Sequence, residues 1–288
     1  MARANSTVGL LHPGEMGSAV GATLVAGGGR VLWSSEGRSP ATRARAIELG
    51  LEDGGSLARV TAAAGVVVSV TPPHAALAQA RAVAALGFRG IYMDANAVAP
   101  ATSRAIGEVV EAAGARFVDG GIIGPANRKP GAARIYLSGP AAAEVAPLFA
   151  SGPIDAHVLT GPPGAASALK MAFAGWNKAS QGLLAAIRAY AIAEGVDAAL
   201  LAEWKISMPD VPARSERAVH DNARKAWRFV GEMEEIAQAF AAVGLPSGFH
   251  EAAADIYRRL ESYKDTAAPP PVEEAARRLL EGRPPAPG

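Results

Sequence analysis

The first half of the chain alternates short β-rich runs with alanine-rich segments that suit helices, and this alternation constrains the fold most. The runs expected as strands are Val8–Leu11, Arg30–Trp33, Val66–Val70, Gly90–Met93, Arg116–Val118 and Arg134–Leu137. Most of the segments between them are long enough for a crossover helix. Units of this kind build a largely parallel sheet with both faces covered, so the pattern predicts an α/β domain.

The second half of the chain has a different pattern, with helix-compatible segments and no convincing strand. The expected helices are Ala165–Glu194, Ala198–Ile206, Glu216–Ala242 and His250–Tyr263. We therefore expect an α/β domain over residues 1–163, an all-α domain over 164–265, and a proline-rich tail over 266–288. The tail contains Pro269–Pro271, so we expect it to be mobile, with one short helix near Glu273–Leu280.

Composition narrows the class of protein. The 288 residues include 28 Lys and Arg against 27 Asp and Glu, a balance that gives no general attraction to nucleic acid or anionic membranes. Cysteine is absent, which excludes disulfides and thiolate chemistry. No apolar run reaches the length of a membrane span, and no group of histidines and carboxylates has a metal-ligand spacing. We expect a cytoplasmic protein with no metal, acting on a small molecule.

A glycine-bearing turn follows the first expected strand, in the sequence His12-Pro13-Gly14-Glu15-Met16-Gly17. In a dinucleotide-binding G-x-G-x-x-G turn, the second glycine lets the pyrophosphate approach and the third lets the helix pack on the strand. Gly14 and Gly17 occupy these two places, whereas His12 occupies the first. Residues 12–16 are therefore predicted to bind a dinucleotide, and a strand-to-helix turn without a ligand is the alternative.

The end of the second expected strand carries residues that bear on the choice of cofactor. An acidic residue there would accept hydrogen bonds from the adenosine ribose, and Arg with hydroxyl groups would receive a 2′-phosphate. Glu36 competes with Ser34, Ser35 and Arg38 at this place. The two hydroxyls and the arginine favour NADP, with NAD as the alternative, and a solvated charge is the competing interpretation of Arg38.

Four segments occur in the order and approximate spacing of known motifs: "GLLHPGEMG", "YMDANAVAP", "FVDGGIIGPANRKPGAARIYLSG" and "GPPGAASALKMAFAGWNKA". They resemble the β-hydroxyacid dehydrogenase and 6-phosphogluconate dehydrogenase superfamily over about the first 180 residues. The resemblance implies a doubly wound Rossmann-type domain, a long interdomain helix and an all-α domain that builds a homodimer. It also implies an active site in the cleft between the domains.

The resemblance implies a role for several residues. The superfamily has a lysine acid or base on the interdomain helix, and the matching residue is Lys170; without the resemblance, Lys170 is a helix lysine with a solvated amine. Asn96 matches a contact on the nicotinamide side, at the end of a strand where doubly wound sheets bind ligands. Thr71 ends another strand beside the expected cofactor crevice, where we expect it only to position the cofactor.

Two departures from the superfamily bear on the substrate. The asparagine expected four residues after the lysine is Ala174, and the next polar residues on that helix face are Asn177 and Lys178, which we expect to orient substrate. Asn177 also replaces a glutamate acid, which argues against decarboxylating phosphogluconate chemistry. Where relatives have a serine and two glycines, this chain has Ile123-Gly124-Pro125. The Gly124 amide is therefore the expected oxyanion donor. The nearby Asn127, Arg128 and Lys129 either replace the lost serine hydroxyl or are exposed turn residues.

The helical half offers further candidates without a motif, namely His220, Asn222, Trp227, Glu232 and Glu234. The acidic residues are compatible with an amine-bearing substrate, and a solvated helix face is the competing interpretation.

The leading hypothesis is an NADP-preferring oxidoreductase that interconverts a small β-hydroxy acid, β-hydroxy amino acids included, with its carbonyl compound. An imine reductase is the enzymatic alternative, and Lys170 argues against it. A cofactor-binding sensor without catalysis is the alternative of another class.

Overall fold

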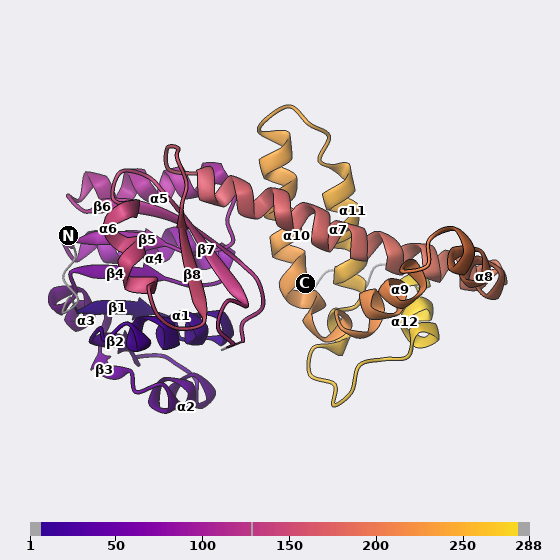
Figure 1. Cartoon of the computed structure of the whole chain (residues 1–288), viewed down its shortest axis with the longest axis horizontal. Coiled ribbons are helices and arrows are strands. Elements are labelled where there is room, and N and C mark those ends of the chain that lie inside the picture. The colour runs from indigo at the N-terminus through magenta and orange to yellow at the C-terminus, as the bar shows by residue number, and fades with distance from the viewer. Residues whose placement is uncertain (1–6, 128, 282–288) are drawn as a thin grey trace. The chain divides into compact units, whose positions relative to one another are not determined.

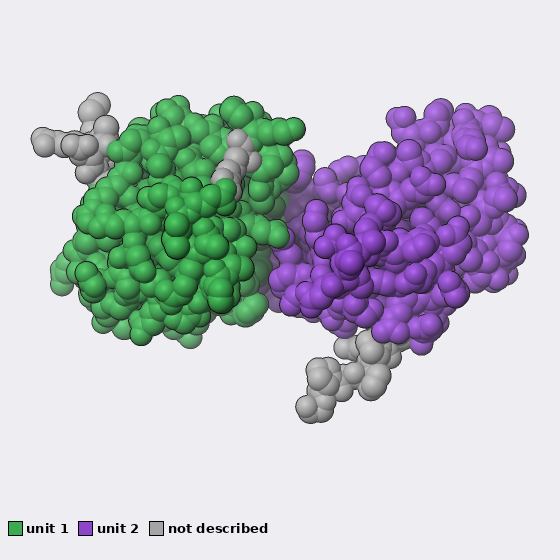
Figure 2. Space-filling view, turned by 90° about the horizontal axis from the view of Figure 1, so that it is seen from below, with its two compact units in different colours: residues 1–171 green, residues 172–288 purple. Residues whose placement is uncertain are grey.

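A computed structural model describes residues 7–127 and 129–281. The chain divides into two compact units, residues 1–171 and 172–288 (Figure 2). The division falls inside helix α7 (Ala165–Ala193), so each unit contains part of this helix. The last residues of the predicted tail, 282–288, lie outside the described residues.

The first unit is built on a sheet of eight strands in the described residues (Figure 1). The strands are β1 (Val8–Leu11), β2 (Val31–Ser34), β3 (Glu52–Gly55), β4 (Val66–Ser69), β5 (Ile91–Asp94), β6 (Arg116–Ile123), β7 (Ala133–Ser138) and β8 (Ile154–Val158). Their order is β3-β2-β1-β4-β5-β6-β7-β8, and every neighbouring pair is parallel except β6 with β7. The predicted α/β fold with a following helical region is therefore confirmed.

The direction of the strand order changes between β1 and β4, which pair in parallel from Val8 with Val66 to Leu11 with Ser69. In open parallel sheets, ligands bind beyond the carboxyl ends of the strands at such a switch point. The turn at His12 and the segment from Val70 to Thr71 leave the sheet at this place.

Helices cover both faces of the sheet, as the burial of its strands requires. One core contains residues of α1 (Glu15–Ala26), α2 (Pro40–Glu48), α6 (Ala142–Val145) and η1 (Ala146–Phe149). The other core contains residues of α3 (Leu57–Ala63), α4 (Pro73–Ala85) and α5 (Pro100–Ala112). The branched side chains of β1 and β4 alternate between these two cores, so both faces of the switch point are packed.

The second unit is helical throughout its described residues. Its elements after α7 are α8 (Asp197–Ser207), α9 (Val211–His220), η2 (Ala223–Lys225), α10 (Ala226–Ala241), α11 (Gly248–Arg259), η3 (Glu261–Tyr263) and α12 (Val272–Leu280). Gly175 and Gly182 let α10 and α11 approach α7: a Cβ on Gly175 would lie 3.3 Å from His250 Cε1, and one on Gly182 would lie 3.5 Å from Ala253 Cβ. The Tyr257 hydroxyl donates to the Lys178 carbonyl at 2.8 Å and ties α11 to α7.

Several expected elements differ in their bounds. Strands β3 and β8 were not predicted, and the strand expected at Arg116–Val118 continues to Ile123. The helix expected over Glu216–Ala242 is broken between His220 and Ala226, where Asn222 turns its side chain back to the Ala218 carbonyl. Within the described residues, no helix combines the length and apolarity that a membrane crossing would require.

Candidate functional site

The turn after β1 has the close packing that a dinucleotide turn needs. A Cβ on Gly17 would lie 2.3 Å from the His12 carbonyl oxygen, so only glycine lets α1 start this close to the strand. The Gly14 amide donates to the same carbonyl at 2.8 Å. His12 has φ +67°, the left-handed region in which the first glycine of such a turn is usually needed. Among the residues described, His12 is the only one other than glycine with a positive φ.

The imidazole of His12 lies beside the place where a pyrophosphate would approach. Its Nε2 is 3.0 Å from the position of a Cβ on Gly14, and its Nδ1 is 3.1 Å from Arg38 Nη1. Because a guanidinium can only donate, Nδ1 accepts, and the neutral ring carries its proton on Nε2. Burial, followed by the charges of Arg38 and Arg45, lowers the pKa of His12 below its ordinary value.

Arginines gather next to this turn, at the end of β2 and on α2. Arg38 Nε is buried and has no hydrogen-bond partner among the described residues. Arg43 donates to the Ser35 carbonyl at 2.7 Å, and Arg45 donates to the Pro13 carbonyl at 3.4 Å. These arginines make the rim of the turn cationic. Only Arg38 was predicted from the sequence to bind cofactor, although all three arginines lie within eight residues.

The other residues predicted to bind cofactor lie around the same turn. Ser34 and Ser35 are buried, and the Ser34 hydroxyl donates to the Gly55 carbonyl at 3.1 Å. Glu15 begins α1, so its backbone is at the amino end of that helix. The Met16 side chain packs against the core, which leaves its backbone for a ligand.

Asn96 braces the ends of β4 and β5. It is only 3% exposed, and its Oδ1 accepts from the Thr71 amide and, at 3.3 Å, from the Thr71 hydroxyl. Its Nδ2 donates to the Ser69 hydroxyl at 3.2 Å and to Asp94. Asn96 thereby fixes the segment that begins at Thr71, which leaves the sheet next to the glycine turn.

Lys170 lies on the second turn of α7, packed against β6. A Cβ on Gly121 would lie 2.5 Å from the Ala166 carbonyl oxygen and 3.1 Å from Lys170 Cβ. Glycine at 121 therefore allows the helix to rest on the strand. Lys170 is partly exposed, and among the described residues its ammonium has no hydrogen-bond or ion-pair partner.

A buried carboxylate holds the start of α7. Asp119 is fully buried on β6, and its Oδ2 accepts from the amides of Gly164 at 2.9 Å and Ser167 at 3.0 Å. The hydroxyls of Ser103, Ser138 and Ser167 also donate to it, at 2.8, 2.9 and 2.6 Å. The first amides of a helix have no partner within the helix, so this carboxylate supplies one. Asp119 was not predicted as a site residue, although an aspartate inside the apolar run RFVDGGII is a signal for one.

The predicted substrate residues lie in different surroundings. Gly124 has φ +127°, and a Cβ there would lie 2.5 Å from the Ala132 carbonyl oxygen, so the chain needs glycine after β6. Arg128 lies outside the described residues. The Lys178 ammonium pairs with Glu232 and lies 4.4 Å from the centre of the Phe229 ring, so its charge is already compensated.

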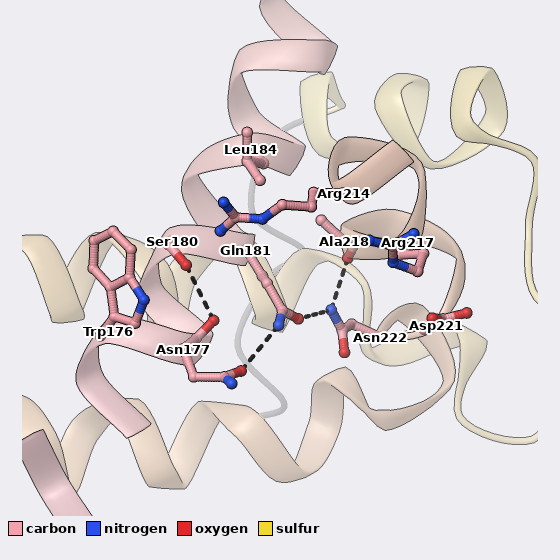
Figure 3. A pocket seen from close by; sticks show the side chains of 10 residues that line it. All are labelled: Trp176, Asn177, Ser180, Gln181, Leu184, Arg214, Arg217, Ala218, Asp221 and Asn222. Atoms are coloured by element: carbon pink, nitrogen blue, oxygen red, sulfur yellow. Dashed lines mark hydrogen bonds between the residues drawn. The ribbon is translucent and has the colours of Figure 1, made fainter. Parts of the chain in front are cut away.

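Asn177 lines a polar cavity of about 330 Å³ within the second unit, between α7 and the α9 region (Figure 3). Gln181 Nε2 donates to Asn177 Oδ1 at 2.9 Å, and Asn222 Nδ2 donates to Gln181 Oε1. Arg214 and Arg217 complete the polar lining, and no sequence motif marks either residue. The other helical-half candidates do not line the cavity, although His220 contacts the lining residue Asp221. Glu234 pairs with Arg258, and Lys264 lies over the Trp227 ring. No group of three or more His, Asp or Glu in the described part of the chain could hold a metal ion.

Comparison with known proteins agrees with this architecture. Residues 191–260 match the family described as "Domain of unknown function (DUF1932)". The solved structure of the conserved protein MTH1747, reported as similar to 3-hydroxyacid dehydrogenases, is 29% identical with a TM-score of 0.68, over 90% of this chain and 98% of that one. No curated protein matches the chain.

Two enzymes of known activity share the fold at lower identity. The Mycobacterium tuberculosis 3-hydroxyisobutyrate dehydrogenase is 18% identical with a TM-score of 0.68, over 95% of this chain and 99% of that one. The imine reductase BcSIRED from Bacillus cereus is 16% identical with a TM-score of 0.56, over 96% and 99%. The similarity to the MTH1747 structure confirms the resemblance to 3-hydroxyacid dehydrogenase-like proteins drawn from the sequence.

Proposed function

We propose that this chain, which has the two-part fold of the 3-hydroxyacid dehydrogenase-like proteins, is an NAD(P)-dependent oxidoreductase acting on a small β-hydroxy acid, β-hydroxy amino acids included. In the oxidation direction the neutral amine of Lys170 accepts the hydroxyl proton, and in reduction its ammonium returns a proton to the carbonyl oxygen. A bound nicotinamide would supply the hydride chemistry at the same carbon. Each turnover thus moves one hydride and one proton.

The residues around the first glycine turn fit a dinucleotide. The crossing at Gly17 is too close for any Cβ, and a Cβ on Gly14 would lie 3.0 Å from His12 Nε2. The amino end of α1 supplies free amides and a partial positive charge for a pyrophosphate. The proton that His12 carries on Nε2 offers one more donor at this place.

The rim of the turn supports NADP over NAD. Arg38 has a buried Nε without a partner among the described residues, and a 2′-phosphate would satisfy it. Arg43 adds positive charge on the same side. Glu36, the residue that would select a free ribose hydroxyl, is exposed.

One observation carries the catalytic assignment: Lys170 stands at the start of a helix that the Asp119 carboxylate fixes to β6. A reacting amine must be held in place to move a proton in one geometry, and this helix start is bonded at several points. We assign Asn96 to positioning on the nicotinamide side through Thr71, and Gly124 to orienting the substrate.

The test is turnover measured by nicotinamide absorbance, with NADP and NAD each offered against β-hydroxy acids, β-hydroxy amino acids and cyclic imines. Lys170→Ala should abolish hydroxy-acid oxidation while the cofactor dissociation constant stays within about twofold of wild type, since Lys170 acts on substrate. Lys205→Ala, on the exposed side of α8, is the matched control and should keep full activity.

Other outcomes would replace this proposal. Imine reduction that survives Lys170→Ala would identify an imine reductase instead of a lysine-dependent dehydrogenase. Tight cofactor binding without turnover of any substrate class would favour a sensor.

We also propose that the active form is a homodimer formed through the helical unit. Phe173, Trp176, Leu183 and Tyr190 lie along one side of α7 and are 44%, 72%, 59% and 65% exposed. A second copy of the chain would bury this apolar stripe. Light scattering should give twice the chain mass for wild type, and Trp176→Glu with Leu183→Glu should give the mass of one chain.

A further inference from the structure

The polar cavity in the second unit has features of a ligand site that lie outside the proposed catalytic chemistry. Its volume, about 330 Å³, falls in the range of small-molecule pockets. Its walls come from α7 and from the segment around α9. Both walls carry groups that can donate and accept hydrogen bonds (Figure 3).

A buried arginine on α7 joins the two walls. The Arg188 side chain, 3% exposed, binds Asp197 through Nε at 2.6 Å and Nη2 at 3.0 Å. Its Nη1 donates to the Ser215 hydroxyl at 3.0 Å, which holds α9 against α7. The backbones of the two walls are therefore held together without a ligand.

A row of carboxamides orients the hydrogen-bonding groups. Asn222 is buried, and its Nδ2 donates to the Ala218 carbonyl at 3.0 Å and to Gln181 Oε1. Gln181 Nε2 donates one hydrogen bond to Asn177 Oδ1 at 2.9 Å. Counting donors and acceptors leaves amide hydrogens on Asn177 and Gln181 and the acceptor Oδ1 on Asn222 for a ligand.

The charges in the lining give the ligand its class. In the described part of the chain, the guanidinium groups of Arg214 and Arg217 have no carboxylate partner. Figure 3 shows Arg214 reaching toward the α7 side chains above Gln181, while Arg217 stays on the α9 side. Asp221, on the same wall as Arg217, brings one carboxylate to the lining, and its Oδ1 lies 3.2 Å from His220 Nδ1. A guanidinium suits a carboxylate, and Asp221 with Asn222 suits a hydroxyl or ammonium donor.

We infer that this cavity binds a small carboxylate that also carries a hydroxyl or amino group. Arg214, with the amides of Asn177 and Gln181, receives the carboxylate, and Asp221 with Asn222 receives the donor group. Asp221 also disfavours a dianion such as phosphate. The inference does not depend on the proposed reaction, because binding here needs no nicotinamide cofactor.

Calorimetric titration of the full chain without cofactor tests the site, with 3-hydroxybutyrate, 3-aminobutyrate, butyrate and inorganic phosphate as probes. We expect the first two to bind at least tenfold more tightly than butyrate or phosphate. Arg214→Gln should weaken them at least tenfold, since it removes the principal cation for the carboxylate. Asp221→Asn should reduce the preference of 3-aminobutyrate over butyrate by at least threefold.

The control is Arg224→Gln, which removes the same charge from an exposed place in η2 and should leave all affinities within twofold. Equal weakening in Arg224→Gln and Arg214→Gln would mean general charge attraction and would overturn the inference. Binding of 3-hydroxybutyrate that is unaffected by Arg214→Gln would place it at another site and would overturn it as well. Failure of turnover in the dehydrogenase assay would leave these titrations unaffected, so the two proposals fail separately.

Discussion

Substitutions of the buried Asp119 should show how much of its stabilising effect comes from accepting the backbone amides at the start of α7 and how much from accepting serine hydroxyls. Its Oδ2 accepts from the backbone amides of Gly164 and Ser167, which cannot turn away. Its Oδ1 accepts from the hydroxyls of Ser103 and Ser167, which can rotate and become acceptors. The two oxygens of this carboxylate are thus not equivalent toward substitution.

The magnitude follows from the partners that each variant leaves. Asp119→Ala leaves two buried amides without an acceptor, and at about 1–3 kcal/mol each this lowers the free energy of unfolding by roughly 2–6 kcal/mol. Asp119→Asn can point its oxygen at the amides and its NH₂ at the two rotatable hydroxyls. It loses only the charge assistance of these bonds, so we expect a loss of about 1–2 kcal/mol.

Urea denaturation followed by circular dichroism measures both variants, with Ser103→Ala as a comparison that removes one hydroxyl donor to the carboxylate and should cost about 1.5–3 kcal/mol. The reasoning is refuted if Asp119→Asn is as damaging as Asp119→Ala, because the rotatable hydroxyls would then give no rescue. A loss below about 1 kcal/mol for Asp119→Ala would refute it too, since the two amides would have found other partners.

Three further changes test other parts of the molecule. Arg38→Ala should weaken NADPH binding about tenfold or more and NADH binding little, as measured by fluorescence titration; equal effects would contradict a 2′-phosphate contact. Because the folded state lowers the pKa of His12, the unfolded chain binds more protons, and stability falls as pH drops below about 6.5. His12→Gly should therefore lose less stability than wild type in urea unfolding between about pH 7.5 and 5.5. Lys178→Met, which removes the ammonium from Glu232 and Phe229, should lower the unfolding free energy by about 2–3 kcal/mol; an unchanged urea midpoint would contradict this.

The accuracy of the sequence predictions depended on how strongly burial fixes a segment. Strand β1 lies between two covering layers, so every residue in it is apolar or glycine, and its predicted bounds match the structure. Strand β3 reads Glu-Asp-Gly-Gly and lies at the edge of the sheet, so no apolar run marks it. Strand β8 lies at the other edge with mostly exposed residues.

Site residues that are close together in the sequence could be predicted, whereas those that come together only in the folded chain could not. The glycine turn is contiguous, so its spacing could be read from the sequence, whereas Asp119 meets Gly164 and Ser167 only after the chain folds. Arg214 and Asn177 line the cavity from separate helices, and no spacing in the sequence predicts that they share it.

His12 replaces the first glycine of the motif but keeps the backbone conformation that this position requires. The first position of the turn needs a positive φ, and His12 adopts +67° at a cost of about 1–2 kcal/mol that a glycine would not incur. Gly17 has no such freedom, since any Cβ there would meet the His12 carbonyl oxygen at 2.3 Å. Gly14 has an ordinary φ of −72°, and its Cβ would be 3.0 Å from the His12 ring, so the histidine itself restricts this position. The contact that the ring makes with Arg38 is what a glycine at position 12 could not supply, and it joins the two halves of the proposed phosphate site.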